Sequence, residues 1–376
     1  MGPTHEHTRR ASQCLVDLRA GHAARPDSLD PGKVFTAFPL PWAVELAARL
    51  HGDRHPDGAR LAEWLVDQAP EPARAELRHL ADTGHCGRAA ADLLARLPAA
   101  PSQPLEISVL GPLQVAFAGV ALTPAELRRG RVRTLLALLV VHRTLSRERA
   151  TDLLWPDLSV RDGARNLRVT LTYLRQLLEP GRPTGEASFH LRADGSTIAL
   201  HPSEYLVVDL WELRRLRRDA DQNRGQGAPE RTLALLEAAT ALWRGEPLAD
   251  LATVASHEHE VEHVRVMQFE SLLELGELRL VRGDADKALT DAERGLALDP
   301  YSERAHRLAL AAALRSHDRP RIDAVRRRAL TMLDELDVMP EPATEILLRQ
   351  VEDRTTGVGR SRARASAALA SRRRPV

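Results

Sequence analysis

The sequence has little of what a secreted or membrane protein requires. Cys14 and Cys86 are its only cysteines, too few for a disulfide framework, and neither lies in a Cys-x-x-Cys spacing. No run of about 20 apolar residues occurs, and residues 1–10 are polar and rich in His, unlike a signal peptide. At 376 residues the chain is longer than a usual domain. We therefore expect a cytoplasmic, multidomain, soluble protein without membrane contact.

The common nucleotide and hydrolase motifs are also absent. The chain has two lysines, Lys33 and Lys287, and Lys33 follows a glycine but precedes Val34, so no Gly-x-x-x-x-Gly-Lys-Ser/Thr loop exists. Neither a Gly-x-Ser-x-Gly elbow nor a Gly-x-Gly-x-x-Gly run occurs. No convergent acid, base or nucleophile is visible. We expect a protein that is not an enzyme, with no catalytic residue and no cofactor.

A cluster of His and Glu raises the question of a metal site. His259 and His263 have the four-residue spacing of helical zinc ligands, and His257 lies close by. Glutamates occupy positions 258, 260 and 262 between them. An exposed, acid-rich helix face explains the pattern as well as a metal site does. We favour the exposed face and predict no metal ligands.

The N-terminal part of the chain is predicted to be helical. Within residues 1–97, apolar residues recur at three- and four-residue spacing over 42–50, 58–68, 71–82 and 88–97. The proline-rich stretch PAAPSQP at 98–104 favours an extended backbone, which is typical of a linker. We expect a small helical segment of unknown role that ends at a domain boundary.

A change of hydrophobic period follows this linker and predicts a second domain, over residues 105–205. Apolar residues alternate over 105–109 and again over 113–117, around a Gly-Pro turn, which predicts a hairpin with a possible third strand at 120–122. Helices are expected at 131–142, 147–155 and 161–178, the second capped by Ser146. A further hairpin, 189–192 with 197–200, encloses an Asp-Gly turn. Strands, three helices and a terminal hairpin predict a winged helix-turn-helix.

Residues 206–353 are predicted to form helix after helix. Gly283-Asp284 followed by Ala288-Leu289, and then the run ALDP ending at Pro300, is typical of a tetratricopeptide-like repeat. Small residues such as Ala288 and Gly295 let paired helices approach closely, and Ser302 is placed to cap the next helix. The tail, 354–376, holds seven arginines and no acid, which predicts disorder. The expected fold class is mainly α with a small α+β domain.

The charges are segregated along the chain. Between Glu126 and Pro180, eleven arginines face six acidic residues, although the net charge of the whole chain is only +1. Between Glu230 and Asp353, acids outnumber bases. We expect the first region to meet a polyanion and the second to contact protein or solvent.

The helix predicted at 161–178 has two faces. Leu167, Leu171, Leu174 and Leu178 form an apolar stripe for the core. The neighbouring face is basic and polar, and its side-chain types can bond guanine or adenine edges and contact thymine methyl groups in a major groove. We assign base reading to Arg165, Arg168, Val169, Thr172, Arg175 and Gln176.

Other arginines of this region are candidates for contacts with DNA phosphates. Such contacts position a protein on DNA without reading its sequence. These arginines precede or begin the two shorter helices or lie on the second hairpin: Arg129, Arg131, Arg147, Arg149 and Arg192. The alternative is an ordinary amphipathic helix surrounded by solvated charge. The preceding short helix, the following hairpin and the local positive charge favour DNA, whereas phosphate contact and solvation remain equally open for the arginines before residue 132.

Several motifs resemble, in order and spacing, the Streptomyces antibiotic regulatory protein family. They are LGPLQV (110–115), RVRTLLALLVVHR (131–143), SRERATDLLWPD (146–157), ARNLRVTLTYLRQLLEP (164–180), VDLWELRRL (208–216) and ALWRGEPLADL (241–251). The resemblance covers 105–353 and implies a winged helix fused to a bacterial transcriptional activation domain of tetratricopeptide-like helices. It does not cover residues 1–100, and the ATPase of the longest family members is missing.

The resemblance implies that the protein activates transcription, binds direct repeats near promoters, often as a homodimer, and recruits RNA polymerase through a sigma factor or the alpha subunit. Secondary-metabolite genes, such as those of antibiotic biosynthesis, are the implied targets, and the implied location is the cytoplasmic nucleoid. From the residues and the resemblance together we expect a sequence-specific regulator of double-stranded DNA. The rival hypothesis is an interaction or signalling scaffold in which the winged helix is a docking module.

Overall fold

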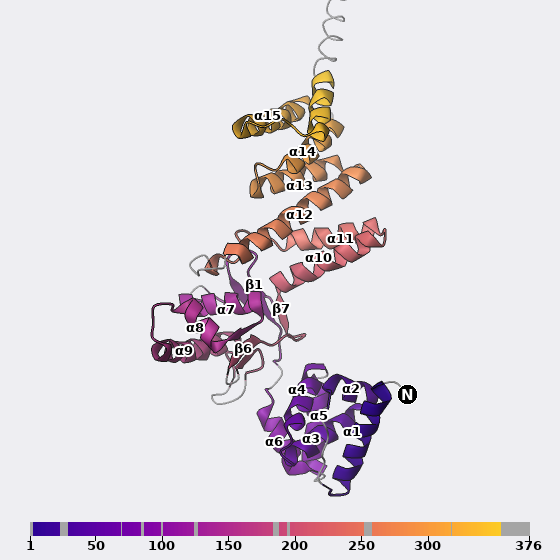
Figure 1. Cartoon of the computed structure of the whole chain (residues 1–376), viewed down its shortest axis with the longest axis vertical. Helices are drawn as coiled ribbons and strands as arrows, with labels where there is room; N and C mark the ends of the chain where they lie inside the picture. The colour runs from indigo at the N-terminus through magenta and orange to yellow at the C-terminus, as the bar shows by residue number, and fades with distance from the viewer. Residues whose placement is uncertain are drawn as a thin grey trace, which may run out of the picture. The chain divides into compact units, whose positions relative to one another are not determined.

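The computed structural model is mainly helical, with two small sheets (Figure 1). It separates into two compact units, one of Met1–Glu106 with Val115–Val207 and one of Ile107–Gln114 with Val208–Val376. No helix among the described residues is long and apolar enough to cross a membrane. The structure describes residues 3–22, 29–68, 70–83, 86–98, 101–123, 127–182, 188–193, 196–251, 258–316 and 318–354.

The N-terminal helices share a core of their own. Leu46, Leu50, Leu61, Leu77 and Leu93 are among its fully buried side chains, and each comes from the apolar face that the sequence predicts. The predicted helices are confirmed to within a few residues, and two further helices precede them. The helices are α1 (Pro3–Arg19), α2 (Pro31–Ala37), α3 (Leu40–Gly52), α4 (Pro56–Gln68), α5 (Pro70–Thr83) and α6 (Gly87–Arg96).

The predicted first hairpin is confirmed and is extended by a strand that no sequence pattern predicts. Strands β1 (Leu105–Ser108), β2 (Gln114–Phe117), β3 (Val120–Ala121) and β7 (Leu206–Val208) form a sheet in the order β3-β2-β1-β7. The third strand of the meander pairs with β2 in antiparallel register. The strand β7 has three residues, too few for an alternating pattern to be recognised.

The three helices predicted next are present as α7 (Gly130–His142), α8 (Arg147–Leu154) and α9 (Val160–Leu178). The second hairpin, β5 (Leu191–Ala193) with β6 (Thr197–Leu200), gains the unpredicted strand β4 (Thr144–Ser146), in the order β4-β6-β5. Ser146 caps α8 as expected, because its hydroxyl accepts the N–H of Arg149 at 3.0 Å. The Asp-Gly turn lies outside the described residues.

From residue 209 onward the chain is helical, as predicted, and successive helices pack on one another. The expected close approach through small residues is present: a Cβ on Gly295 would lie 3.0 Å from Leu273 Cδ2, and Ala288 is fully buried. Ser302 caps its helix, as expected. Of the tail predicted to be disordered, 354–376, Arg354 ends the last helix, and residues 355–376 lie outside the described residues. The helices are α10 (Asp209–Gly225), α11 (Pro229–Ala241), α12 (Glu258–Arg282), α13 (Ala285–Leu298), α14 (Glu303–Arg315), α15 (Arg319–Leu336) and a last helix over 342–354.

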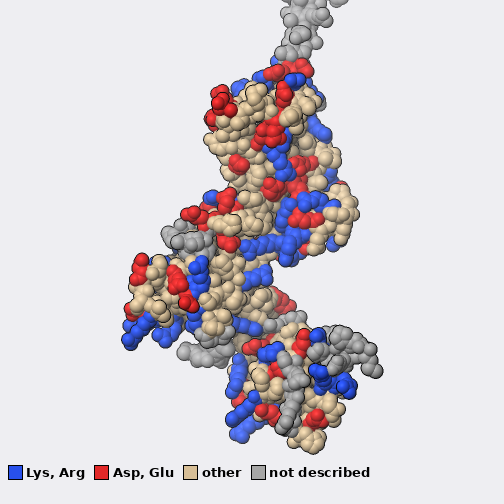
Figure 2. Space-filling model, viewed as in Figure 1, with Lys and Arg blue, Asp and Glu red and all other residues tan. Residues whose placement is uncertain are grey.

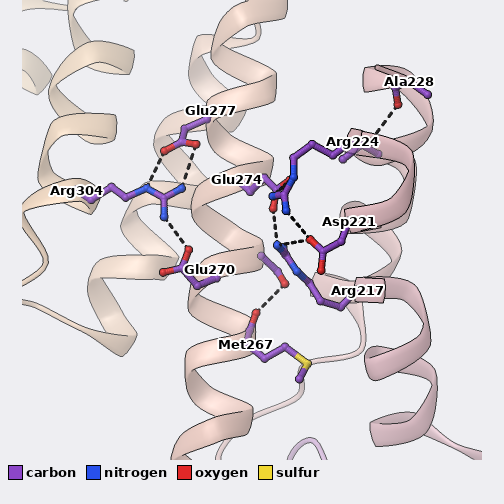
Figure 3. A network of polar contacts seen from close by, with 11 residues as sticks. Arg217, Asp221, Arg224, Ala228, Met267, Glu270, Glu274, Glu277 and Arg304 are labelled. Atoms are coloured by element: carbon purple, nitrogen blue, oxygen red, sulfur yellow. Dashed lines mark hydrogen bonds and ion pairs between the residues drawn. The ribbon is translucent and has the colours of Figure 1, made fainter. Parts of the chain in front are cut away.

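Ion pairs join the helices of this second unit (Figure 3). Glu274 of α12, only 8% exposed, accepts from Arg217 at 2.7 Å and from Arg224 at 2.8 Å, both on α10. On the other side of α12, Arg304 of α14 donates to Glu277 at 2.9 Å. Much of the acidic charge predicted for this half of the chain therefore pairs with arginine between helices.

Asp209, the first residue of α10, binds a neighbouring backbone segment of the same unit. Its carboxylate accepts the N–H groups of Val109 and Leu110 at 2.9 Å and that of Leu210 at 2.7 Å. Arg244 lies 3.6 Å from the same carboxylate, and its own N–H donates to the carbonyl oxygen of Leu110 at 2.7 Å. Burial raises the pKa of Asp209, while these hydrogen bonds and Arg244 act in the opposite direction.

Candidate nucleic-acid interface

The helix α9 begins at a well-formed cap and buries the stripe predicted for it. The hydroxyl of Ser159 accepts the N–H of Asp162 at 3.2 Å and donates to the Asp162 carboxylate at 2.7 Å. The four predicted leucines are all at most 2% exposed. Their burial fixes the rotation of α9 about its own axis, and it leaves the adjacent polar face open to solvent.

The base-reading residues predicted on that open face are almost all exposed. Arg165, Arg168, Thr172 and Gln176 are exposed, and Val169 is 50% exposed. The Thr172 hydroxyl donates to the Arg168 carbonyl oxygen at 3.0 Å, so its acceptor lone pairs and methyl group stay available. Figure 2 shows Lys and Arg side chains gathered along the edge of this domain where Figure 1 places α9.

Arg175 is half buried rather than exposed, and it lines the same surface pocket as Arg182 and Arg192. Burial lowers its pKa, and the positive charges of Arg182 and Arg147 lower it further, whereas Glu179 acts in the opposite direction. The positive charges of these arginines repel one another, so an anion placed among them would be favoured. The chemistry of this end of the face therefore suits a phosphate oxygen as well as a base edge.

The side chain of Arg129 packs on α9. Its guanidinium carbon lies 3.4 Å from the centre of the Tyr173 ring, a cation–π contact between the residue preceding α7 and the middle of α9. Arg131, on the first turn of α7, and Arg149, on the first turn of α8, are exposed. Four of the five arginines predicted as phosphate ligands therefore lie at the starts of these two helices, and one of the four packs on an aromatic ring.

Arg192, the predicted phosphate ligand on the second hairpin, is bonded across the hairpin. Its Nη2 donates to the Nε2 atom of His201 at 2.9 Å. Beside it, His190 is fully buried, and neither ring nitrogen has a hydrogen-bond partner among the described residues. Burial lowers the pKa of His190 to about 4, and the nearby His201 contributes to the shift. His190 is therefore neutral at physiological pH.

A carboxylate at the end of α9 connects this helix to the hairpin. Glu179 Oε1 accepts the Ser188 hydroxyl at 2.6 Å and the His190 N–H at 2.8 Å. No sequence pattern assigns a role to Glu179 or Tyr173. The signal that could have found Glu179 is the Pro-Gly that follows it, because that turn brings the chain back past the end of the helix.

The His and Glu cluster considered as a metal site lies at the start of α12. His259 and His263 are exposed, and His257 lies outside the described residues. Across the described ranges, no three His, Cys, Asp or Glu side chains come together as metal binding would require.

Comparison with known proteins gives one family match, and it lies within the second unit. Residues 208–352 match the bacterial transcriptional activator domain. A solved structure, Mycobacterium tuberculosis EmbR in complex with a low-affinity phosphopeptide, is similar in fold, with a TM-score of 0.56 and 20% sequence identity over 73% of each chain. No curated protein sequence matches this chain.

The family match begins at the last residue of β7 and ends within the last described helix, so it covers the whole run of helices that Asp209 begins. The function that this domain's description gives is transcription activation. The resemblance inferred from the sequence motifs is consistent with this match and with the shared fold. The chain therefore carries, over residues 208–352, a bacterial transcriptional activator domain, the domain of a transcriptional regulator.

Proposed function

We propose that the winged helix binds double-stranded DNA in a sequence-specific manner, with α9 in the major groove. The observation that carries this proposal is the solvent-exposed face of α9, where Arg165, Arg168, Thr172 and Gln176 stand beside a fully buried leucine stripe. A major groove admits one helix, and these side chains match the donor and acceptor patterns displayed there.

Each residue of the face has a distinct role in this proposal. Arg165 and Arg168 bond guanine O6 and N7, and Gln176 bonds adenine N6 and N7. Val169 and the Thr172 methyl group contact thymine methyl groups. Arg175 reads a base edge at the boundary with the phosphates, where its half-buried position keeps its rotamer restricted.

The second group of arginines holds the DNA backbone. Charge-assisted bonds to phosphate oxygens fix the register of a helix in its groove without contributing sequence information. Arg129 is stacked on Tyr173, and this contact restricts its side chain. The proposed phosphate ligands are Arg129, Arg131, Arg147, Arg149 and Arg192.

The activator domain is the part of the chain that contacts a protein partner in this proposal. We propose that its helices contact RNA polymerase, through a sigma factor or the alpha subunit, and that two chains bind direct repeats near a promoter as a homodimer. The protein would act at the nucleoid in the cytoplasm, with secondary-metabolite genes as targets. The family match supports transcription activation in general, and these finer assignments extend it.

The test is the salt dependence of DNA binding, followed by footprinting at the bound sites. If several arginines neutralise phosphates, the logarithm of affinity falls linearly with the logarithm of salt concentration. The slope is proportional to the number of phosphate contacts. A flat dependence would overturn the DNA assignment in favour of a docking module. Footprints over two direct repeats would support the dimer, whereas a single half-site footprint would contradict it.

A further inference from the structure

The N-terminal helices border a large, open cavity for which the transcriptional role does not account. Its volume is about 1410 Å³, and its lining comes from residues 18–96. The end of α3, the turn into α4 and the start of α6 form the walls. Protein sites for small molecules commonly have volumes of roughly 300–1000 Å³, so this space is sufficient for a metabolite.

The lining is strongly basic. Four arginines and three histidines face two aspartates, Asp53 and Asp92. Figure 2 shows Lys and Arg side chains on the side of this domain where Figure 1 places α6. The basic residues are Arg49, Arg54, Arg88, Arg96, His22, His51 and His55.

Two of these arginines already have acidic partners, and two do not. Arg49 donates to Glu45 at 2.8 Å, and Arg96 lies 3.9 Å from Asp92. Arg54 and Arg88 are exposed, and within the described part of the chain neither makes an ion pair or a side-chain hydrogen bond. They lie on different walls, Arg54 in the turn between α3 and α4 and Arg88 on the first turn of α6. The cavity therefore presents guanidinium groups free to bind an added anion.

We propose that this cavity binds a small phosphate-bearing metabolite, with Arg54 and Arg88 as its principal ligands. Guanidinium groups match phosphate oxygens bidentately. Gly87 and Ala89, on the same turn of α6 as Arg88, also line the cavity, so the positive end of this helix adds to the attraction. The histidines can donate hydrogen bonds to the remaining oxygens. The N-terminal helical domain thereby becomes a ligand-sensing domain of the regulator, a role independent of the proposed DNA contacts.

The experiment measures pyrophosphate binding to the full-length chain by calorimetry. The double variant Arg54→Gln, Arg88→Gln should bind at least 10-fold more weakly than the wild type, and each single variant should show part of that loss. Arg78→Gln is the matched control, because Arg78 is exposed on α5 outside the cavity. It should bind as the wild type does. Equal affinity of the double variant and this control would overturn the proposal.

A second measurement locates the bound anion. Cys86 lines the cavity, whereas Cys14 is buried elsewhere in the core. Alkylation of Cys86 at pH 8.5, followed by mass spectrometry, should slow when pyrophosphate saturates the protein, and this protection should disappear in the double variant. Anion binding that leaves the alkylation rate of Cys86 unchanged would place the anion outside the cavity, and the cavity proposal would fail while the DNA proposal stood.

Discussion

Gly163 of α9 packs directly against Thr151 of α8. A Cβ on Gly163 would lie 2.3 Å from the Thr151 methyl carbon, far inside contact distance. The threonine cannot rotate away freely, because its hydroxyl donates to the Arg147 carbonyl oxygen at 2.8 Å. This contact sets how closely the two helices of the helix-turn-helix cross, and therefore where the proposed reading face lies.

Gly163→Ala should therefore destabilise the winged helix by about 1–3 kcal/mol, as overpacking does, despite the better helix propensity of alanine. Thr151→Ser removes the methyl group and keeps the hydroxyl. In that background the same Gly163→Ala change should be neutral or stabilising. Denaturant unfolding of the four proteins measures the coupling. Equal costs in both backgrounds would show that the methyl contact does not limit the packing.

Arg168→Ala and Arg149→Ala should weaken DNA binding in different ways. Loss of a base contact costs about 1–3 kcal/mol of binding free energy and relaxes specificity at one base pair. Loss of a phosphate contact weakens binding to all sequences about equally and reduces the salt slope. Affinity measurements on a site and its single-base variants distinguish the two. The same profile for both variants would mean that α9 does not read bases.

His190 makes stability depend on pH. Its pKa is lowered to about 4 in the folded chain, against an ordinary value of 6.5. The unfolded chain therefore binds more protons between these values, and stability falls as the pH drops from 6.5 towards 4. The full effect is roughly 3 kcal/mol at 1.36 kcal/mol per pKa unit.

His190→Leu removes this titration without breaking a side-chain hydrogen bond, since neither ring nitrogen is bonded among the described residues. Thermal unfolding at pH 7 and pH 4.5 should show a smaller loss of stability in the variant than in the wild type. His263→Gln, on an exposed face of α12, is the control and should retain the wild-type difference. An unchanged difference in His190→Leu would contradict the assignment.

Asp209→Ala should destabilise the backbone around Val109 and Leu110, which the Asp209 carboxylate binds. Three backbone N–H groups lose their acceptor, and an unsatisfied buried donor costs about 1–3 kcal/mol. Hydrogen exchange at Val109 and Leu110 should accelerate, with Asp209→Asn intermediate because its amide keeps one carbonyl acceptor. Asp219→Ala, which removes an exposed ion pair on the same helix, should leave both amides protected. Protection that persists in Asp209→Ala would show that other contacts hold this segment.

Hydrophobic period determined most of the secondary structure. The leucine stripe of α9, the alternation in β1 and β2 and the helices of the N-terminal segment are all local patterns, so they can be predicted from neighbouring residues. The exposed position of Arg165, Arg168 and Thr172 follows from the same geometry, because a helix that buries one face must expose the other. The three-residue strands β4 and β7 carry too short a pattern to be predicted.

Long-range contacts were decided only by the tertiary structure. The stacking of Arg129 on Tyr173, the half burial of Arg175 and the bond between Arg192 and His201 join residues whose proximity no local spacing indicates. The basic cavity likewise forms because separate helices end beside one another. By itself, then, the sequence determined which elements form and which faces they bury, since these depend on local periodicity. The positions of the arginines around DNA and around the cavity depend on how distant elements pack, which only the folded chain decides.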